Sequence, residues 1–303
     1  MDFPTKQGLF FCSALLFFTI LASFPSVITA EDYTALVYKG CANQKFQDSN
    51  GIYTQNLKSL FNSLVSSAQQ QKTFFTTTSG DSTNAIMGLY QCRGDLSTAD
   101  CATCVTKLPS LAQKYCGKAI AGRVQLSGCY LRYELSGFKQ VSGTQLLYKI
   151  CGSSRSSGSA EFEQKRDSAF DKLEGGIKNG SVLFYTGSYE SVYVLGQCEG
   201  DLSNSDCGDC VKTATEQADS ECGDSVSGQI YLHKCYISYS YYANGVPTLT
   251  SSSGTVGSNH HTTQKTVAIV VGGVAAVGFV FVCLMFIKSL LKKKRGAKHG
   301  DYY

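Results

Sequence analysis

Apolar side chains recur at helical spacing in two separate stretches of the chain. Residues 53–68 place them three or four positions apart, and residues 162–177 repeat the pattern. Segments rich in β-branched and aromatic residues predict strands between and after these helices. The predicted strands are 35–39, 85–91, 123–134 and 145–150, and later 182–197, with an interruption near Gly187, and 229–242. Helix and strand signals therefore occur in two similar series, which indicates an α+β fold.

A further helix is predicted in each series. It begins at Ser97 in the first and at Ser203 in the second, because an acid follows each serine after three residues, as in a capping box. Pro109 is expected to end or kink the first of these helices, since proline lacks an amide hydrogen. Each series thus supplies two helices and several strands.

The first thirty residues have the layout of a secretory signal peptide. Lys6 precedes an apolar run at 9–24, and small residues stand before a predicted cleavage site at Glu31. Residues 1–30 are therefore predicted to be removed, and the mature chain begins outside the cell.

A second long apolar run lies near the other end of the chain. Residues 266–287 are 22 uncharged residues, and at about 1.5 Å per residue such a helix crosses the roughly 30 Å hydrocarbon core of a bilayer. Lys288 and the basic cluster at 292–295 follow it directly, which places this end in the cytoplasm. We therefore predict a single-pass membrane protein with its amino-terminal part outside and a short tail at 288–303.

Smaller features of the span and tail leave alternatives open. Gly272 and Ala276 form a small-xxx-small pair that permits close packing of two membrane helices, or they reflect ordinary glycine and alanine content. Cys283 is either an inert apolar residue or an acylation site. The basic residues of the tail set the topology, and they are also suited to contact anionic lipid head groups.

The cysteines show that the extracellular part is one unit written twice. Five cysteines recur 106 residues later, and Cys41 corresponds to Cys151 at an offset of 110. Without Cys12 and Cys283, the chain's 14 cysteines leave two sets of six. The predicted organisation is a first domain at 31–140, a second at 141–247 and a polar stalk at 248–265.

Cysteine content and charge narrow the class of protein. Fourteen cysteines beside four histidines indicate disulfides formed in an oxidising compartment. The net charge of +4 comes from the last sixteen residues, which hold six basic residues and one acidic residue, so nucleic-acid binding has no support. Residues 31–151 carry +5 and residues 152–265 carry −6, which suggests either complementary docking faces or drift between solvated surfaces.

Two Cys-x-x-Cys doublets raise the question of redox or zinc chemistry. A redox pair is expected at a helix start in a thioredoxin-like unit, and a zinc site needs two further ligands at comparable spacing. Neither context surrounds Cys101 and Cys104, or Cys207 and Cys210. We therefore expect structural disulfides, with the two cysteines of each doublet bonded to different partners.

The rest of the mature chain offers little for catalysis. Its histidines before the span are His233, expected on a strand with its ring hydrogen-bonded, and His260 and His261 in the stalk. A tail of sixteen residues holds no kinase domain. We predict no enzymatic activity, no cofactor and no metal, and a candidate N-glycosylation site at Asn179.

The cysteine spacing also carries a family resemblance. The pattern C-x8-C-x2-C, at 92–104 and at 198–210, is followed by x11-C and x12-C and resembles the plant stress-antifungal, or ginkbilobin-like, domain in both repeats. The resemblance implies an antiparallel sheet packed with two α-helices in each domain. It also implies the disulfides Cys41–Cys116, Cys92–Cys101, Cys104–Cys129, Cys151–Cys222, Cys198–Cys207 and Cys210–Cys235.

Tandem copies with one span and a minimal basic tail resemble the plasmodesmata-located proteins, and the segments 39–44 and 189–200 strengthen that likeness. The resemblance implies a plasma-membrane protein of plant cell-to-cell channels that restricts trafficking, partly by promoting callose deposition. Implied partners are other family members and viral movement proteins. The alternatives are a carbohydrate-sensing co-receptor that binds cell-wall glycans and acts with receptor-like kinases, and an apoplastic antifungal protein, which the span disfavours.

A sugar site is the last candidate. The seed lectin of the ginkbilobin-like family binds mannose through an Asn, an Arg and a Glu, and this chain has Ala42, Arg123 and Glu134 at those positions of the first repeat. The second repeat has none of the three residue types there. We prefer to interpret Arg123 and Glu134 as a cross-strand ion pair and the site as vestigial.

Overall fold

The computed structural model describes residues 32–81, 84–156 and 158–246. The predicted signal peptide, stalk, span and tail lie outside the described residues, and so do Gly272, Ala276 and Cys283. Within the described ranges, no helix has the length and apolar character needed to cross a bilayer.

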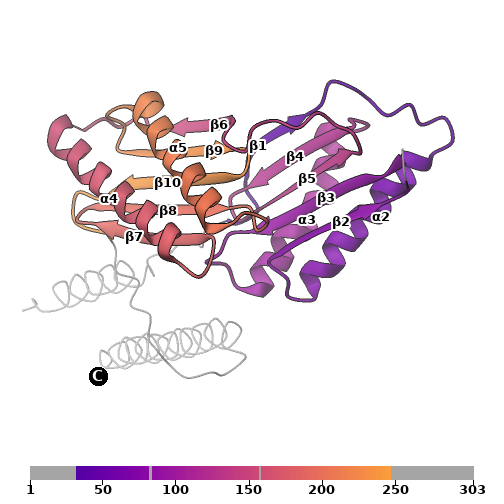
Figure 1. Ribbon diagram of the computed structural model, residues 1–303, viewed down its shortest axis with the longest axis horizontal. Helices are drawn as coiled ribbons and strands as arrows, with labels where there is room; N and C mark the ends of the chain where they lie inside the picture. The colour runs from indigo at the N-terminus through magenta and orange to yellow at the C-terminus, as the bar shows by residue number, and fades with distance from the viewer. Residues whose placement is uncertain (1–31, 82–83, 157, 247–303) are drawn as a thin grey trace, which may run out of the picture. The chain divides into compact units, whose positions relative to one another are not determined.

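Each repeat is a five-stranded antiparallel sheet with two helices (Figure 1). The first sheet has the strand order β1-β4-β5-β3-β2 and the second the matching order β6-β9-β10-β8-β7. The first repeat comprises β1 (Leu36–Cys41), α2 (Ile52–Gln69), β2 (Phe74–Ser79), β3 (Ile86–Cys92), α3 (Thr98–Cys116), β4 (Ala121–Leu126) and β5 (Cys129–Leu135). The second comprises β6 (Leu146–Cys151), α4 (Ser159–Asn179), β7 (Phe184–Tyr189), β8 (Val192–Cys198), α5 (Asn204–Cys222), β9 (Ser227–Leu232) and β10 (Cys235–Tyr241). The predicted α+β fold with two tandem domains is confirmed.

The serine caps begin α3 and α5 as expected. The side chains of Ser97 and Ser203 each accept the backbone N–H three residues later at 3.1 Å. Pro109 was expected to end or kink its helix, and the first alternative is wrong, because α3 continues to Cys116. Buried Leu108 and Ala112, on either side of the proline, hold the helix against the sheet, and this packing outweighs the missing hydrogen bond.

Two strands predicted as single runs are hairpins, and a third segment, predicted with an interruption, breaks at a different residue. The segment 123–134 breaks between β4 and β5, and 229–242 breaks between β9 and β10, at connections of only two residues. The break in 182–197 falls at Glu190, which has a φ of 47°, and not at Gly187. Strand β2 was not expected, because its sequence FFTTTS does not alternate apolar and polar residues.

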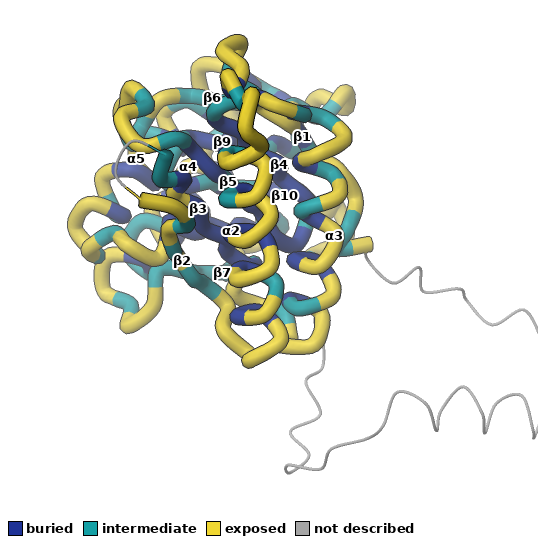
Figure 2. The backbone as a smooth tube through the Cα atoms, turned by 90° about the vertical axis from the view of Figure 1, so that its right-hand side faces the viewer, coloured by how far each residue is buried: buried dark blue, intermediate teal, exposed yellow. Residues whose placement is uncertain are grey.

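The helices cover one face of each sheet, and the two cores fill by different means. Leu60 lies over Gly88, where an added Cβ would come within 2.7 Å of the leucine. The corresponding positions of the second repeat hold Ala169 and Val194, and there Leu173 packs on Gly196 instead, where an added Cβ would come within 2.8 Å of the leucine. Figure 2 shows the result, with buried backbone concentrated in the strands and an exposed outer side on α2.

Candidate functional site at the seam between the repeats

Six disulfides staple the two repeats. Each Cys-x-x-Cys doublet is divided between two partners, so that Cys101 is bonded to Cys92 while Cys104 is bonded to Cys129. The bonds are Cys41–Cys116, Cys92–Cys101, Cys104–Cys129, Cys151–Cys222, Cys198–Cys207 and Cys210–Cys235. These are the pairs that the family resemblance implies, and every bond stays within one repeat.

The faces of the sheets that the helices leave uncovered carry the contacts between the repeats. Alternation along β5 directs Leu131 and Tyr133 into the core of the first repeat and Tyr130 and Arg132 to the opposite face. These two outward residues both bond to Glu199 of the second repeat. We call this contact between the repeats the seam.

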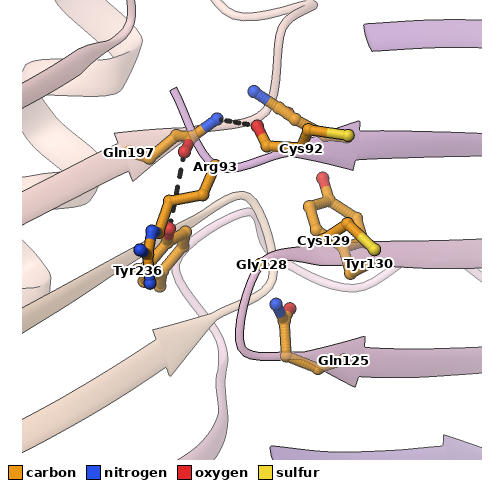
Figure 3. Close-up of a pocket in the computed structure, with 9 residues that line it drawn as sticks. Cys92, Arg93, Gln125, Gly128, Cys129, Tyr130, Gln197 and Tyr236 are labelled. Atoms are coloured by element: carbon orange, nitrogen blue, oxygen red, sulfur yellow. Dashed lines mark hydrogen bonds between the residues drawn. The ribbon is translucent and has the colours of Figure 1, made fainter. Parts of the chain in front are cut away.

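Two equivalent glutamines form the centre of the seam. Gln91 donates its amide to the carbonyl of Cys198 at 3.0 Å and accepts the N–H of Gly200 at 3.0 Å. Gln197, the same position 106 residues later, donates to the carbonyl of Cys92 at 2.9 Å (Figure 3) and accepts the N–H of Gly94 at 3.1 Å, so it makes the matching two bonds in the opposite direction. The contact is therefore pseudo-twofold, like the interface of a symmetric dimer in which one chain supplies both halves.

Aromatic rings extend the seam on one side of the glutamines. Tyr38 of the first repeat stacks on Tyr148 of the second with ring centroids 5.0 Å apart, and it meets Tyr231 edge-on at 5.3 Å. Tyr231 in turn stacks on Tyr236 at 5.3 Å. Such ring pairs contribute beyond the area that they bury, so they help to fix the two repeats in one arrangement.

A buried carboxylate of the second repeat pairs with cations from both repeats. The Glu199 side chain is fully buried, and it accepts hydrogen bonds from Tyr130 at 2.7 Å and from Arg132 at 2.8 Å. Lys234, from its own repeat, pairs with the same carboxylate. Burial opposes the ionised form, but the Arg132 charge and the Lys234 contacts prevail and lower the pKa of Glu199 to about 2. An acid of the negatively charged second repeat thus pairs with an arginine of the positively charged first repeat.

The three expected sugar-site positions line one cavity of about 310 Å³ beside the seam. Ala42, Arg123 and Glu134 share it with Leu147 and His233 of the second repeat. The structure therefore brings the three positions together, and it adds a wall from the second repeat that spacing within one repeat cannot reveal.

The predicted ion pair between Arg123 and Glu134 is wrong. The strand register places Arg123 opposite Arg132, and Glu134 pairs with Arg132 at 3.6 Å. Arg123 instead donates to the carbonyl of His233 at 2.8 Å and lies over the ring of Tyr130 at 4.1 Å. Its guanidinium therefore contributes to the seam.

His233 was expected on a strand, but it lies in the connection between β9 and β10. Burial and the nearby Arg132 and Arg123 charges lower the pKa of its ring to about 4, so the ring is neutral at neutral pH.

Asn179 is the exposed last residue of α4, and its glycosylation stays a prediction.

The comparisons with known proteins agree with this architecture. Residues 40–136 and 150–242 match the salt stress response/antifungal family. The chain is 51% identical to plasmodesmata-located protein 2 of Arabidopsis thaliana, over 89% of the chain and 90% of that protein. It is 49% identical to plasmodesmata-located protein 1 of the same plant, over 87% and 90%.

The chain belongs to the plasmodesmata-located protein family.

Solved structures support the tandem arrangement of this plasmodesmata-located protein. The tandem DUF26 ectodomain of the Arabidopsis thaliana cysteine-rich receptor-like protein PDLP8 is 31% identical, with a TM-score of 0.63, over 69% of this chain and 98% of the other. The chain is also 27% identical to cysteine-rich receptor-like protein kinase 19 of the same plant, and it spans less than half of that protein.

Sequence reasoning missed the seam residues of this plasmodesmata-located protein. Gln91 and Gln197 stand inside the repeated segments, but repetition alone does not show which face of the strand they occupy. The stronger signal lies two positions after each glutamine, where the first repeat has Arg93 and the second has Glu199. Glu199 bonds to Arg132 of the other repeat, so the reversed charge marks a residue that joins the two repeats.

Proposed function

We propose that this protein is a type I membrane protein of plasmodesmata that limits cell-to-cell trafficking, partly by promoting callose deposition at the channel. Its family membership supports the location, and the predicted span at 266–287 supplies the anchor. In this proposal, residues 31–247 face the cell wall and residues 288–303 face the cytoplasm.

The proposed partners are those that the family resemblance implies, and the structure of the extracellular part is compatible with docking. Two repeats fixed across one seam present a single surface, which suits docking of another family member, a receptor-like kinase ectodomain or a viral movement protein. The unlike net charges of residues 31–151 and 152–265 favour contact between the first repeat of one copy and the second repeat of another.

We expect the membrane segment to contain the signal that targets the protein to plasmodesmata. A fluorescent fusion of the full chain should form puncta in the wall that coincide with callose staining. Residues 260–303 behind an unrelated signal peptide and reporter should form the same puncta, because the small-residue pair Gly272/Ala276 offers a packing face within the bilayer. Uniform labelling of the plasma membrane by the short fusion would show that the targeting signal lies in the ectodomain.

A lectin-like co-receptor is the second candidate, and the cavity shared by Ala42, Arg123 and Glu134 is the observation that favours it. We nevertheless expect no high-affinity mannose site. Ala42 has no polar group, and Arg123 is already bonded to His233, so sugar hydroxyls would lose water contacts without replacement at about 1 to 3 kcal/mol each.

Calorimetry of residues 31–258 against mannose and mannan measures this directly. The expected result is no saturable binding in the micromolar range. Micromolar binding that Arg123→Ala abolishes would make the lectin function the leading one. A Lys107→Ala variant on the exposed side of α3 serves as the matched control.

A further inference from the structure

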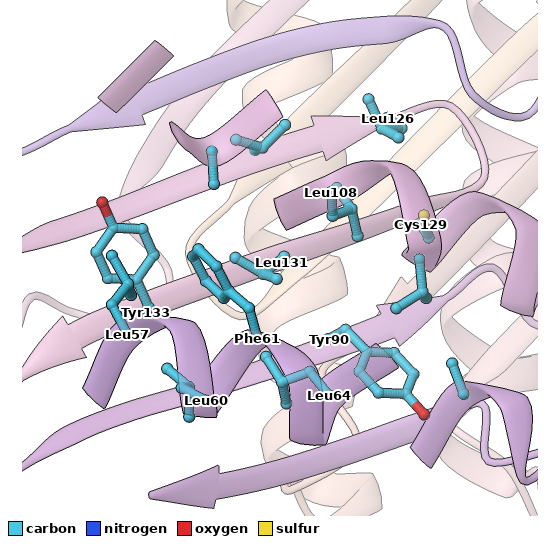
Figure 4. Packing of buried hydrophobic residues seen from close by; sticks show 14 of the residues in the cluster. Leu57, Leu60, Phe61, Leu64, Tyr90, Leu108, Leu126, Cys129, Leu131 and Tyr133 are labelled. Carbon is cyan, nitrogen blue, oxygen red and sulfur yellow. The ribbon is translucent and has the colours of Figure 1, made fainter. Parts of the chain in front are cut away.

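A second cavity, of about 480 Å³, lies between α2 and α3 of the first repeat, away from the seam. Its floor is apolar and consists of the buried side chains of Phe46, Leu57 and Phe61. Figure 4 shows Leu57 and Phe61 on the side of α2 that faces Tyr133. Pro109 of α3 forms part of the opposite wall. We call this cavity the interhelical groove.

In the second repeat, side chains fill the place that corresponds to the interhelical groove. Phe61 contacts Tyr133 edge-on at 5.6 Å, and Phe170 contacts Tyr239 edge-on at 5.5 Å. These equivalent contacts align α4 with α2 at an offset of 109 residues, so Arg166 of α4 takes the place of Leu57.

Arg166 fills its position with ion pairs and hydrogen bonds. Its side chain is 5% exposed, pairs with Asp219 at 2.8 Å and donates to the carbonyl of Gly223. The first repeat has Gln113 and Gly117 at the positions of these two partners, and both line the groove. The groove therefore results from a change of residue types at the same place in a shared fold.

The rim of the groove is cationic. Lys58 and Lys118 line it, and no aspartate or glutamate does. The carboxylate of Asp48, which is not part of the lining, accepts the backbone N–H groups of Tyr53 and Thr54, each at 3.0 Å, and its charge also interacts with that of Lys118. An anionic group at the rim would meet two lysines without a competing acid in the lining.

The size of the groove indicates a small molecule. The α2 residues that line it run from Thr54 to Asn62, which is about 12 Å along a helix at 1.5 Å per residue. A volume of about 480 Å³ falls within the range of ligand pockets. We propose that the interhelical groove binds an amphipathic aromatic anion of about two rings, with its rings on the apolar floor and its carboxylate between Lys58 and Lys118.

Naphthalene-2-carboxylate is the probe, and the neutral 2-naphthamide is its matched control. Both are titrated against the full chain in lipid nanodiscs, and the signal of empty nanodiscs is subtracted. We expect saturable binding of the carboxylate and about fivefold weaker binding of the amide, the effect of losing two exposed charge contacts. Equal affinity for the two probes would overturn the anionic assignment.

Variants then locate the site. Leu57→Arg combined with Gln113→Asp copies the pair that closes the second repeat, and it should reduce carboxylate binding at least tenfold. Leu57 is buried, so an arginine there can also disturb folding. Lys58→Glu combined with Lys118→Glu changes only exposed residues and avoids this problem. This second variant should weaken binding of the carboxylate and leave that of the amide unchanged.

Control variants decide between this groove and other surfaces. Lys107→Glu, on the exposed side of α3 outside the groove, should bind the carboxylate as the unmodified chain does. Binding that survives both groove variants, or that Arg123→Ala at the seam cavity removes, would overturn the proposal.

Discussion

Replacement of Glu199 with glutamine is expected to lower the free energy of unfolding of the ectodomain by about 3 kcal/mol, because it removes the fully buried carboxylate that Arg132 and Lys234 share. The two cations then keep only their more exposed partners, Glu134 and Asp201. Urea unfolding followed by circular dichroism measures the change. The matched control is Glu221→Gln, which removes a half-exposed acid paired with Lys149 and should cost about 1 kcal/mol or less.

The same carboxylate predicts a pH dependence. The pKa of Glu199 falls to about 2 in the folded protein from a usual value of 4.5, so the unfolded chain binds its proton first as the pH drops. Its contribution to stability is complete above pH 4.5 and is lost as the pH falls toward 2. The unmodified ectodomain should therefore lose more stability over this interval than the Glu199→Gln variant. Parallel pH profiles of the two proteins would contradict the assigned role of the seam.

Loss of a single disulfide should prevent export. Cys101→Ser or Cys207→Ser breaks one bridge in a domain of about one hundred residues, and the expected cost of about 2 to 5 kcal/mol should retain the protein in the secretory pathway. Secretion and non-reducing electrophoresis give the measurement. Normal export with one free thiol at the cell surface would show that the bridge is dispensable.

The bridges should also differ in importance. Cys41–Cys116 closes a sequence separation of 75, whereas Cys92–Cys101 closes one of 9. Because the entropy of loop closure grows with the logarithm of loop length, removal of both cysteines of the longer bridge should cost about 2 kcal/mol more. The paired replacements Cys41→Ser/Cys116→Ser and Cys92→Ser/Cys101→Ser leave no unpaired thiol and make this comparison clean.

The sequence predicted those features that local spacing controls. Helical periodicity identified α2 and α4, and the serine caps at Ser97 and Ser203 marked the starts of α3 and α5. The hairpin connections were missed because two residues such as Ser127 and Gly128 interrupt an apolar run too briefly to change its pattern. Pro109 was expected to end or kink its helix, because the hydrogen bond that proline removes is a local cost. Packing of the folded protein outweighs that cost, and the sequence pattern does not show this packing.

The candidate site was less accessible to sequence reasoning. Ala42, Arg123 and Glu134 do line one cavity, but the partner of Arg123 is a carbonyl 110 residues away. No pattern of residues indicates such a contact, because strand alternation gives the face of a side chain and not what lies opposite it. The role of Glu199 likewise depends on how one repeat faces the other.

The spread of a cytosolic fluorescent protein from single transformed leaf epidermal cells tests the proposed function most directly. Raised levels of the full chain should reduce the number of receiving cells and increase callose staining at the puncta, and its removal should have the opposite effects. A chain in which an unrelated span and tail replace residues 266–303 should reach the plasma membrane and leave the spread unchanged. Unaltered spread despite punctate accumulation of the full chain would contradict the proposal that this protein limits cell-to-cell trafficking.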